Sequence, residues 1–391
     1  MVEEPEIQSP KQCLIYKVLP QLRRWNEAAY TPQVISVGPI HHNNDRLKAM
    51  EEHKQRFFRS FVKRNKIELV HLVRTIREME ESIRGCYAET FDISSDVFVK
   101  MIMVDAGFIL EILCGYGVLG QIPWATAVMF DLLLLENQLP FFVIEKLHQL
   151  AFPSDSSISN YNALLELSRN YFEPHFNFKF RDNLPIVEIG HFTDLFRVVQ
   201  LPKKQPKRGC EQADLLYTAT QLHEAGVKFE VLKAKCRFDI KFEKGVLKIP
   251  QFELDDWTEV VTRNIMALEQ ISYITNACFT DYFIFMDSLI NTGEDVDLLC
   301  KKKILVNCLG DNNAAMSIIN DLNKGIICVR WREDYIDICN KLNSFYENPW
   351  HKWKVTLKSQ YFSTPWRAAS TVAAIILLVL TFIQTVCSIK K

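Results

Sequence analysis

The chain has 391 residues, with 46 basic against 47 acidic side chains, a formal net charge of -1 and 48% hydrophobic residues. This charge balance provides no overall field to attract nucleic acid, and the hydrophobic share excludes a disordered chain. The length predicts one large or two moderate domains. The eleven cysteines include no CxxC pair, which favours buried thiols over disulfides or zinc sites.

The N-terminal residues 1–14 are acidic, contain prolines and lack an apolar signal region. We expect this segment to be disordered and the bulk of the chain to lie in the cytosol. Apolar residues at three- and four-residue spacing from 45 to 83 predict two amphipathic helices, with a break near Asn65. The next run, SDVFVKMIMVDAGFILEILCGYG, is apolar on nearly all sides and predicts a buried helix that ends at Gly115 and Gly117.

Residues 131–147, DLLLLENQLPFFVIEKL, are apolar but contain four charges, so they are too interrupted to cross a membrane. Pro140 disfavours a helical conformation at Leu139, which predicts two buried helical pieces that meet at NQLP, with Pro140 opening the second. The polar residues of the joint should bind backbone groups that the break leaves free. The candidate structural or partner-contact residues are Asp131, Glu136, Asn137, Gln138 and Pro140.

Four carboxylates lie in apolar surroundings, where raised pKa values and catalytic roles are possible. They are Asp105, Glu111, Asp131 and Glu136. Their spacing puts the members of each neighbouring pair on different helical faces, so neither pair forms an acid/base couple on one helix. We therefore expect them to be neutralised by Arg23, Arg24 or a helix N-terminus.

Residues 15–200 form the predicted helical first half, and the basic, proline-containing segment 201–212 is the predicted linker. The second half, 213–349, combines further helices with alternating apolar and polar residues around 238–243. Lys244 and Gly245 follow as a turn, which predicts a small β-hairpin.

Residues 368–389, AASTVAAIILLVLTFIQTVCSI, contain no charge and would extend roughly 33 Å as a helix, enough to cross a bilayer core of about 30 Å. In the preceding segment, 350–367, aromatic and basic side chains predict a membrane interface: Trp350, Trp353, Trp366 and Arg367. The predicted fold class is mainly α: a multi-helix globular body with a small β-hairpin insertion and one C-terminal transmembrane helix. We expect a tail-anchored, single-pass protein, with the lipid bilayer as partner of 368–389 and the body in the cytosol.

Three motifs suggest chemistry. GYGVLG matches the dinucleotide fingerprint, but a helical run precedes it and Pro123 follows, so we interpret Gly115, Gly117 and Gly120 as a helix stop. HHNND, 41–45, matches the HxxxD motif of plant acyltransferases, although their DFGWG segment is absent; acyl transfer by His41 is the enzyme alternative.

The third motif is a group of nearby histidines, His41, His42 and His53, which lack further ligands at metal spacing. The chain also contains no GxSxG or GxxxxGK[ST] motif. We expect no catalytic residue, cofactor, metal or nucleic-acid partner, and the sequence indicates no small-molecule substrate.

Several long blocks carry a family resemblance: YKVLPQLRRWNEAAYTPQVISVGPIHH, AMEEHKQRFF, MIMVDAGFILEIL, DLLLLENQLPFFVIEKL, ATQLHEAGVKFE, FDIKFEKGVLKIP, FMDSLINTGEDVDLL and TPWRAASTVAAIILLVLTFIQTVCSI. In this order, from about 15 to 389, the chain resembles the plant family called domain of unknown function 247, or uncharacterised protein family 0481. One departure is Lys303, where the family commonly has a helix-stop glycine.

The resemblance implies a plant-specific, mostly helical protein with a C-terminal membrane helix and no established catalytic activity. Some grass members of the family are associated with self-incompatibility, so the resemblance implies a recognition or signalling role. The expected partner is a protein whose identity the sequence does not indicate.

Overall fold

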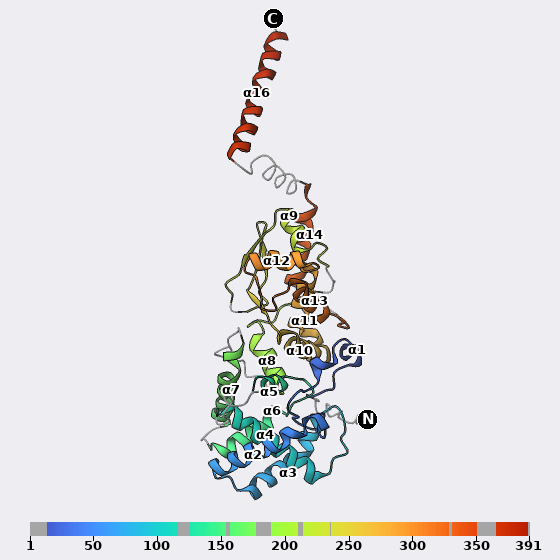
Figure 1. Ribbon diagram of the computed structural model, residues 1–391, viewed down its shortest axis with the longest axis vertical. Coiled ribbons are helices and arrows are strands. Elements are labelled where there is room, and N and C mark those ends of the chain that lie inside the picture. Colours follow the sequence, from blue (N-terminus) through green and yellow to red (C-terminus); the bar gives the residue numbers. More distant parts are fainter. Residues whose placement is uncertain are drawn as a thin grey trace, which may run out of the picture.

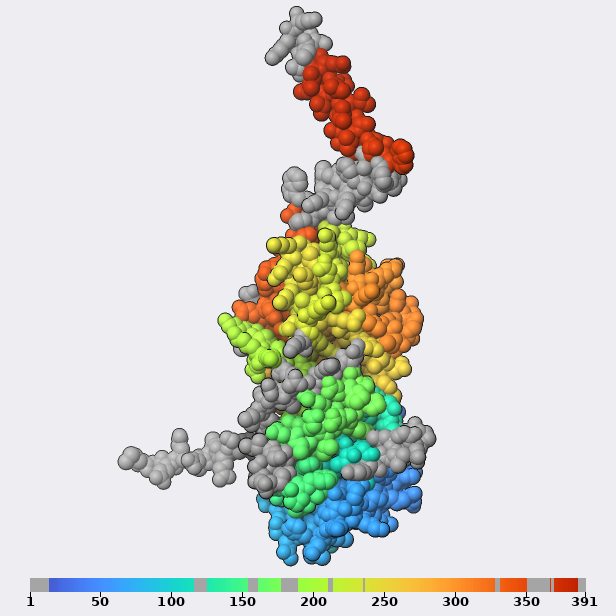
Figure 2. Space-filling view, turned by 90° about the vertical axis from the view of Figure 1, so that its left-hand side faces the viewer, coloured from blue at the N-terminus to red at the C-terminus, as the bar shows by residue number. Residues whose placement is uncertain are grey.

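The computed structural model describes residues 14–115, 125–153, 157–176, 189–209, 214–234, 236–327, 331–349 and 365–389. Figure 1 shows two stacked parts, with the first half of the chain below and the second half above. In the space-filling view of Figure 2, the blue-to-green part and the yellow-to-orange part are in contact, and the red C-terminal helix stands apart. A mainly helical body with small sheets is thus confirmed.

The first half consists of helices joined by short turns. Its elements are α1 (Pro20–Arg23), the 3-10 helices η1 (Glu27–Tyr30) and η2 (Asp45–Leu47), α2 (Lys48–Asn65), α3 (Leu69–Gly85), α4 (Ser95–Leu113), α5 (Ala125–Asp131), α6 (Phe141–Ala151), α7 (Ser157–Phe172), η4 (Glu173–His175) and α8 (Phe192–Gln200). The predicted break near Asn65 is confirmed, because Lys66 follows α2 in the left-handed conformation, with φ of 52°.

Helix α4 is the centre of this half. Fifteen of its nineteen residues are buried, and α2, α3, α6 and α7 pack around it. This burial on all sides explains why its sequence has no polar face. The helix ends at Leu113, and Gly115 follows with φ of 71°. Gly117 and Gly120 lie outside the described residues.

The joint at 132–140 is longer than predicted. Helix α5 ends at Asp131, so residues 132–139 form turns and extended chain where the sequence predicted helix up to NQLP. Pro140, with φ of -57°, is the residue before α6, where its missing N–H removes no helical hydrogen bond. The side chains of Asn137 and Gln138 bind backbone carbonyls of residues 131–134, which would otherwise accept helical hydrogen bonds. The spacing of residues in the sequence does not indicate these bonds.

The second half packs helices against two small sheets. Its elements are α9 (Ala219–Glu224), β1 (Lys228–Val231), β2 (Lys241–Glu243), β3 (Val246–Ile249), β4 (Phe252–Leu254), α10 (Thr258–Ser272), η5 (Ile274–Asn276), α11 (Cys278–Leu289), α12 (Gly293–Lys301), β5 (Leu305–Asn307), α13 (Asn312–Leu322) and α14 (Glu333–Glu347).

The predicted hairpin is confirmed: β2 and β3 pair antiparallel, with Glu243 opposite Val246. Lys244 and Gly245 both have positive φ, as two-residue hairpin turns require. The parallel pairs β1–β3 and β4–β5 were not predicted.

The segment predicted as a linker is hydrogen-bonded to the second half. The Gly209 amide donates to the Trp331 carbonyl, and the Glu333 amide donates to the Lys207 carbonyl. The N-terminal segment, residues 14–44, contacts both halves, since η1 packs on α10. Residues 1–13 of the predicted disordered start lie outside the described residues, whereas the Leu14 amide donates to the Cys86 carbonyl.

Helix α16 (Pro365–Ile389) contains the predicted span 368–389. Its large apolar side chains that the structure describes are exposed: Val372, Ile375, Ile376, Leu377, Leu378, Val379, Leu380, Phe382 and Ile383. Within the described parts of the chain, however, no helix combines the length and hydrophobicity needed to cross a membrane. The spanning helix therefore stays a prediction.

Candidate functional site

Asn137 and Gln138 bind the backbone groups that the joint between α5 and α6 leaves free. The Asn137 side chain accepts from the Val37 amide at 2.7 Å and donates to the carbonyls of Ile35 and Asp131. The Gln138 amide nitrogen donates to two carbonyls of the joint, both at 2.7 Å, and its oxygen accepts from the Phe192 amide. Both side chains are buried, so they hold the joint against the N-terminal segment and α8.

Asp131 holds the same N-terminal segment through a row of backbone amides. Its carboxylate accepts from the amides of Gln33, Val34 and Ile35 at 2.7–2.9 Å. Burial raises the pKa of Asp131 to about 6, and these three hydrogen bonds offset only part of the effect. Its carboxylate therefore serves as a structural acceptor.

Glu136 forms the predicted pair with Arg23. One carboxylate oxygen accepts from the Val18 amide at 2.6 Å, and the other faces the Arg23 guanidinium and lies 3.1 Å from His41 Nε2. Burial raises the pKa of Glu136, but His41, Arg23 and the Val18 amide together lower it further, so this pKa lies below its ordinary value. Glu136 is thus an ionised acceptor at neutral pH.

The two carboxylates of α4 pair with α2. Asp105 binds the buried ammonium of Lys54 at 2.6 Å and accepts from the Gly38 amide at 2.9 Å. Glu111 pairs with both terminal nitrogens of Arg64. Neither pairing involves Arg23 or Arg24, so the expected partners were wrong for this helix, although the expected neutralisation is present.

The two residues of the HxxxD motif point to different partners. His41 lies beside Glu136, whereas Asp45 is exposed and pairs with Lys48 at 2.5 Å. Asp45 therefore does not orient the His41 ring, which is the role that this motif requires of its carboxylate. Among the residues that the structure describes, no three His, Cys, Asp or Glu side chains are grouped to bind a metal.

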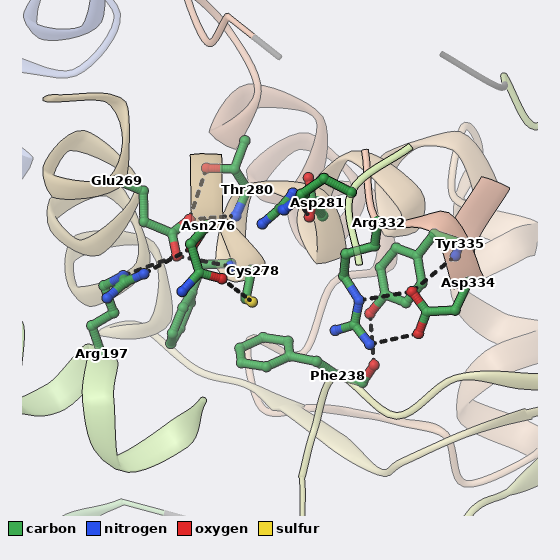
Figure 3. Close-up of polar contacts among 12 residues, drawn as sticks. Arg197, Phe238, Glu269, Asn276, Cys278, Thr280, Asp281, Arg332, Asp334 and Tyr335 are labelled. Carbon is green, nitrogen blue, oxygen red and sulfur yellow. Dashed lines mark hydrogen bonds and ion pairs between the residues drawn. The ribbon is translucent and has the colours of Figure 1, made fainter. Parts of the chain in front are cut away.

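A second buried polar cluster joins the two halves, and the sequence reasoning did not identify it (Figure 3). Glu269 of α10 accepts from Arg197 of α8 at 3.2 Å and from the amide and hydroxyl of Thr280 at 2.9 and 3.0 Å. Arg197 also donates to the Asn276 carbonyl at 2.7 Å. Burial raises the pKa of Glu269, with Arg197 and the Thr280 bonds acting against it.

Two further ion pairs extend this cluster. Arg208 pairs with Asp281 of α11. Arg332 forms a two-bond pair with Asp334 at 3.0 and 2.7 Å, as Figure 3 shows. Burial raises the pKa of Asp281 to about 7, more than Arg208 lowers it. The Arg208–Asp281 pair, between residues 73 positions apart, thus attaches the segment around Arg208 to α11.

A local signal for this cluster existed: Asp281 interrupts the apolar helix α11, and Glu269 follows the apolar run IMAL of α10. Their partners could not be found from spacing, because they lie 72 and 73 positions away. Of the predicted membrane-interface residues, Trp366 is exposed at the start of α16. Trp350 and Trp353 lie outside the described residues, as does the side chain of Arg367.

The fold and these contacts define a class of mainly helical protein in which buried carboxylates hold distant segments together. A family model described as plant protein of unknown function, DUF247, matches residues 15–380, and the chain belongs to this family.

Two relatives from Arabidopsis thaliana support this membership. The UPF0481 protein At3g47200 is 26% identical, over 97% of this chain and 87% of that protein. The putative UPF0481 protein At3g02645 is 22% identical, over 91% of this chain and 86% of that protein. No solved structure matches the chain.

Proposed function

We propose that this chain is a non-enzymatic, membrane-anchored protein whose body lies in the cytosol and binds another protein in recognition or signalling. The observation that carries the anchor is the exposure of apolar side chains on every side of α16, for example Leu378 at 71% and Phe382 at 71%. Each Å² of such surface left in water costs about 25 cal/mol, and a bilayer would remove that cost. The uncharged run 368–389 has the length of a bilayer core.

The contacts of the buried carboxylates support the non-enzymatic part of this proposal. Asp131, Glu136 and Glu269 accept hydrogen bonds from backbone amides, and Glu136 and Glu269 also pair with arginines. A carboxylate held in this way cannot transfer a proton to a substrate without breaking the contacts that join segments of the fold. The family resemblance adds the expectation of a recognition or signalling role.

Proximity labelling in plant tissue tests the recognition role. A labelling enzyme is fused to the N-terminus of the full chain, and to a control in which only residues 350–391 follow the enzyme. We expect a reproducible set of proteins labelled by the full chain and not by the control, since the body supplies the recognition. Identical sets from both fusions would contradict the proposal.

An acyl-transfer assay tests the non-enzymatic part. The purified full chain is incubated with a panel of acyl-CoA donors and hydroxyl or amine acceptors, beside a His41→Ala variant. We expect no release of free CoA above the buffer rate from either protein. Turnover by the wild-type chain that His41→Ala abolishes would instead establish the acyltransferase alternative.

A further inference from the structure

A pocket of about 340 Å³ lies between the two halves, in the range of small-molecule binding sites. The first half contributes Phe176, after η4, and Gln200, at the end of α8. The second half contributes Arg237, Phe252 of β4, and Trp257 and Thr262 at the start of α10. Because both halves supply walls, a ligand here would contact the junction that the polar cluster of Figure 3 also holds.

Arg237 lines this pocket without a direct carboxylate partner among the described residues. Its guanidinium lies over the Phe252 ring, 5.3 Å from the ring centre, and within the described part of the chain it forms no ion pair. Burial lowers the pKa of Arg237, more than Tyr282, Cys236 and Asp255 raise it. The side chain is half-buried, so its guanidinium is partly removed from water, and an anion in the pocket would pair with it.

The fully buried arginines of the described chain differ in this respect. Arg197 pairs with Glu269, Arg263 with Glu259, and Arg332 with Asp334. Such pairing is the usual arrangement for a buried guanidinium, because its five N–H groups each need an acceptor. Arg237 differs from these arginines because its side chain lines a pocket and forms no ion pair with a described carboxylate.

The two acids that line the pocket are engaged elsewhere. Asp255 accepts from the amides of Trp257 and Thr258 and from the Thr258 hydroxyl, as the cap of α10. Glu253 accepts from the Cys308 thiol. Repulsion by these two carboxylates grows with the charge of an anionic ligand, so a ligand with a single negative charge fits this pocket better than a doubly charged one.

The other residues that line the pocket indicate which groups a ligand would carry besides the negative charge. Four aromatic rings, those of Phe176, Phe252, Trp257 and Phe279, suit a flat apolar body. Gln200 Oε1 is buried and has no hydrogen-bond partner, while the amide nitrogen of the same side chain donates to the Phe196 carbonyl. A ligand with an O–H or N–H group would satisfy this oxygen.

We propose that this pocket binds a small aromatic monocarboxylic acid that also carries a hydrogen-bond donor, with Arg237 holding the carboxylate. The aromatic body packs among the four rings, and the donor satisfies Gln200 Oε1. This binding is independent of the membrane anchor and of the protein partner, so it can fail while the proposed function stands.

The test titrates 4-hydroxybenzoate into the full chain held in lipid nanodiscs, followed by ligand-observed NMR. The neutral analogue 4-hydroxybenzamide is titrated in parallel. We expect the acid to bind, and Arg237→Gln to weaken its binding by about ten- to a hundredfold while changing amide binding little, since only the acid uses the charge. Binding of neither probe up to millimolar concentration, or equal affinity for both, would overturn the proposal.

A stability measurement separates this role from a structural one. Arg237→Gln removes an unpaired cation, so its thermal midpoint should equal or exceed that of the wild type without ligand. Arg197→Gln is the matched control: it strands the buried Glu269 carboxylate and should lower the midpoint. If Arg237→Gln lowers the midpoint as much as Arg197→Gln, Arg237 is a structural residue and the proposal is wrong.

Discussion

The Asn137 side chain connects its own joint to two other pieces of chain: the N-terminal segment at Ile35 and Val37, and the end of α5 at Asp131. The sequence predicted that Asn137 binds backbone groups, because Pro140 interrupts the helix and the backbone groups freed there need partners. Arg23, which pairs with Glu136, was one of the three partners that the sequence offered for the four buried carboxylates. The sequence could not predict that Asp131 binds the amides of residues 33–35, since nothing local marks amides 96–98 positions away.

Replacing Asn137 with Ala should lower the free energy of unfolding by about 3 kcal/mol, because it leaves the buried Val37 amide and Ile35 carbonyl without this partner and removes one donor from the Asp131 carbonyl. Chemical denaturation measures the change. Asn313→Ala, at an exposed helical position, is the control and should change little. An Asn137→Ala protein of unchanged stability with lost partner binding would mark Asn137 as a functional contact.

Lys303 forms a turn in the left-handed conformation that favours glycine. It has φ of 60°, and its amide and that of Ile304 donate to the carbonyls of Cys300 and Leu299, which closes the end of α12. Lys303→Gly should raise the free energy of unfolding by about 0.5–1 kcal/mol, since a side chain is unfavourable in this conformation.

The adjacent Lys302, with φ of -84°, is the matched control for that change. Lys302→Gly should destabilise by about 0.5–1 kcal/mol, because glycine there only adds freedom to the unfolded chain. The same direction of change in both variants would show that backbone conformation does not decide the effect at Lys303.

At the scale of elements, the sequence pattern predicted the helices and the hairpin that depend on neighbouring residues. The amphipathic pair α2 and α3, the buried α4 and the β2–β3 hairpin follow from periodicity and turn chemistry. The parallel pairs β1–β3 and β4–β5 do not, because their strands meet only after the intervening chain has folded. The candidate cluster around Glu269 and Asp281 was missed for the same reason.

Burial of the Asp281 carboxyl in α11 should make stability depend on pH. The pKa of Asp281 is about 7 in the folded protein against an ordinary 3.8, so between about pH 4 and 7 the folded state binds this proton more tightly. This group's contribution to stability therefore falls as pH rises through that window, with Arg208, Glu269 and Arg332 as the charges that face it.

Thermal midpoints between pH 5 and 7.5 measure this dependence. Asp281→Asn should reduce the part of the pH dependence that comes from this carboxyl, so its profile should be flatter than that of the wild type in this window. Asp337→Asn, at an exposed residue paired with Lys341, should leave the profile unchanged. Identical profiles for Asp281→Asn and the wild type would rule out this titration.

At the scale of the whole molecule, the two halves are held together by buried contacts. Arg197 pairs with Glu269 across the junction, and Asn264 of α10 binds the Ala29 carbonyl and the Leu135 amide. These contacts join residues more than 70 positions apart, so each half contains buried polar groups whose hydrogen-bond partners lie in the other half. The basic segment 201–209 runs along this junction and is bonded to residues 331 and 333.

Calorimetry of the full chain should therefore show one unfolding transition for the body, because interfaces of this kind couple halves into one cooperative unit. Arg197→Met should shift the whole transition to lower temperature, since it leaves Glu269 unpaired. Two transitions, only one of which Arg197→Met shifts, would show that the halves fold independently.

Membrane fractionation of the full chain and of a chain lacking residues 368–391 tests the central claim most directly. The full chain should remain in the membrane pellet after a high-salt wash and after alkaline extraction, and the shortened chain should move to the soluble fraction. A third chain, with 368–389 replaced by an unrelated membrane span, should pellet like the full chain. A shortened chain that stays in the washed pellet, or a full chain that high salt releases, would contradict the anchor.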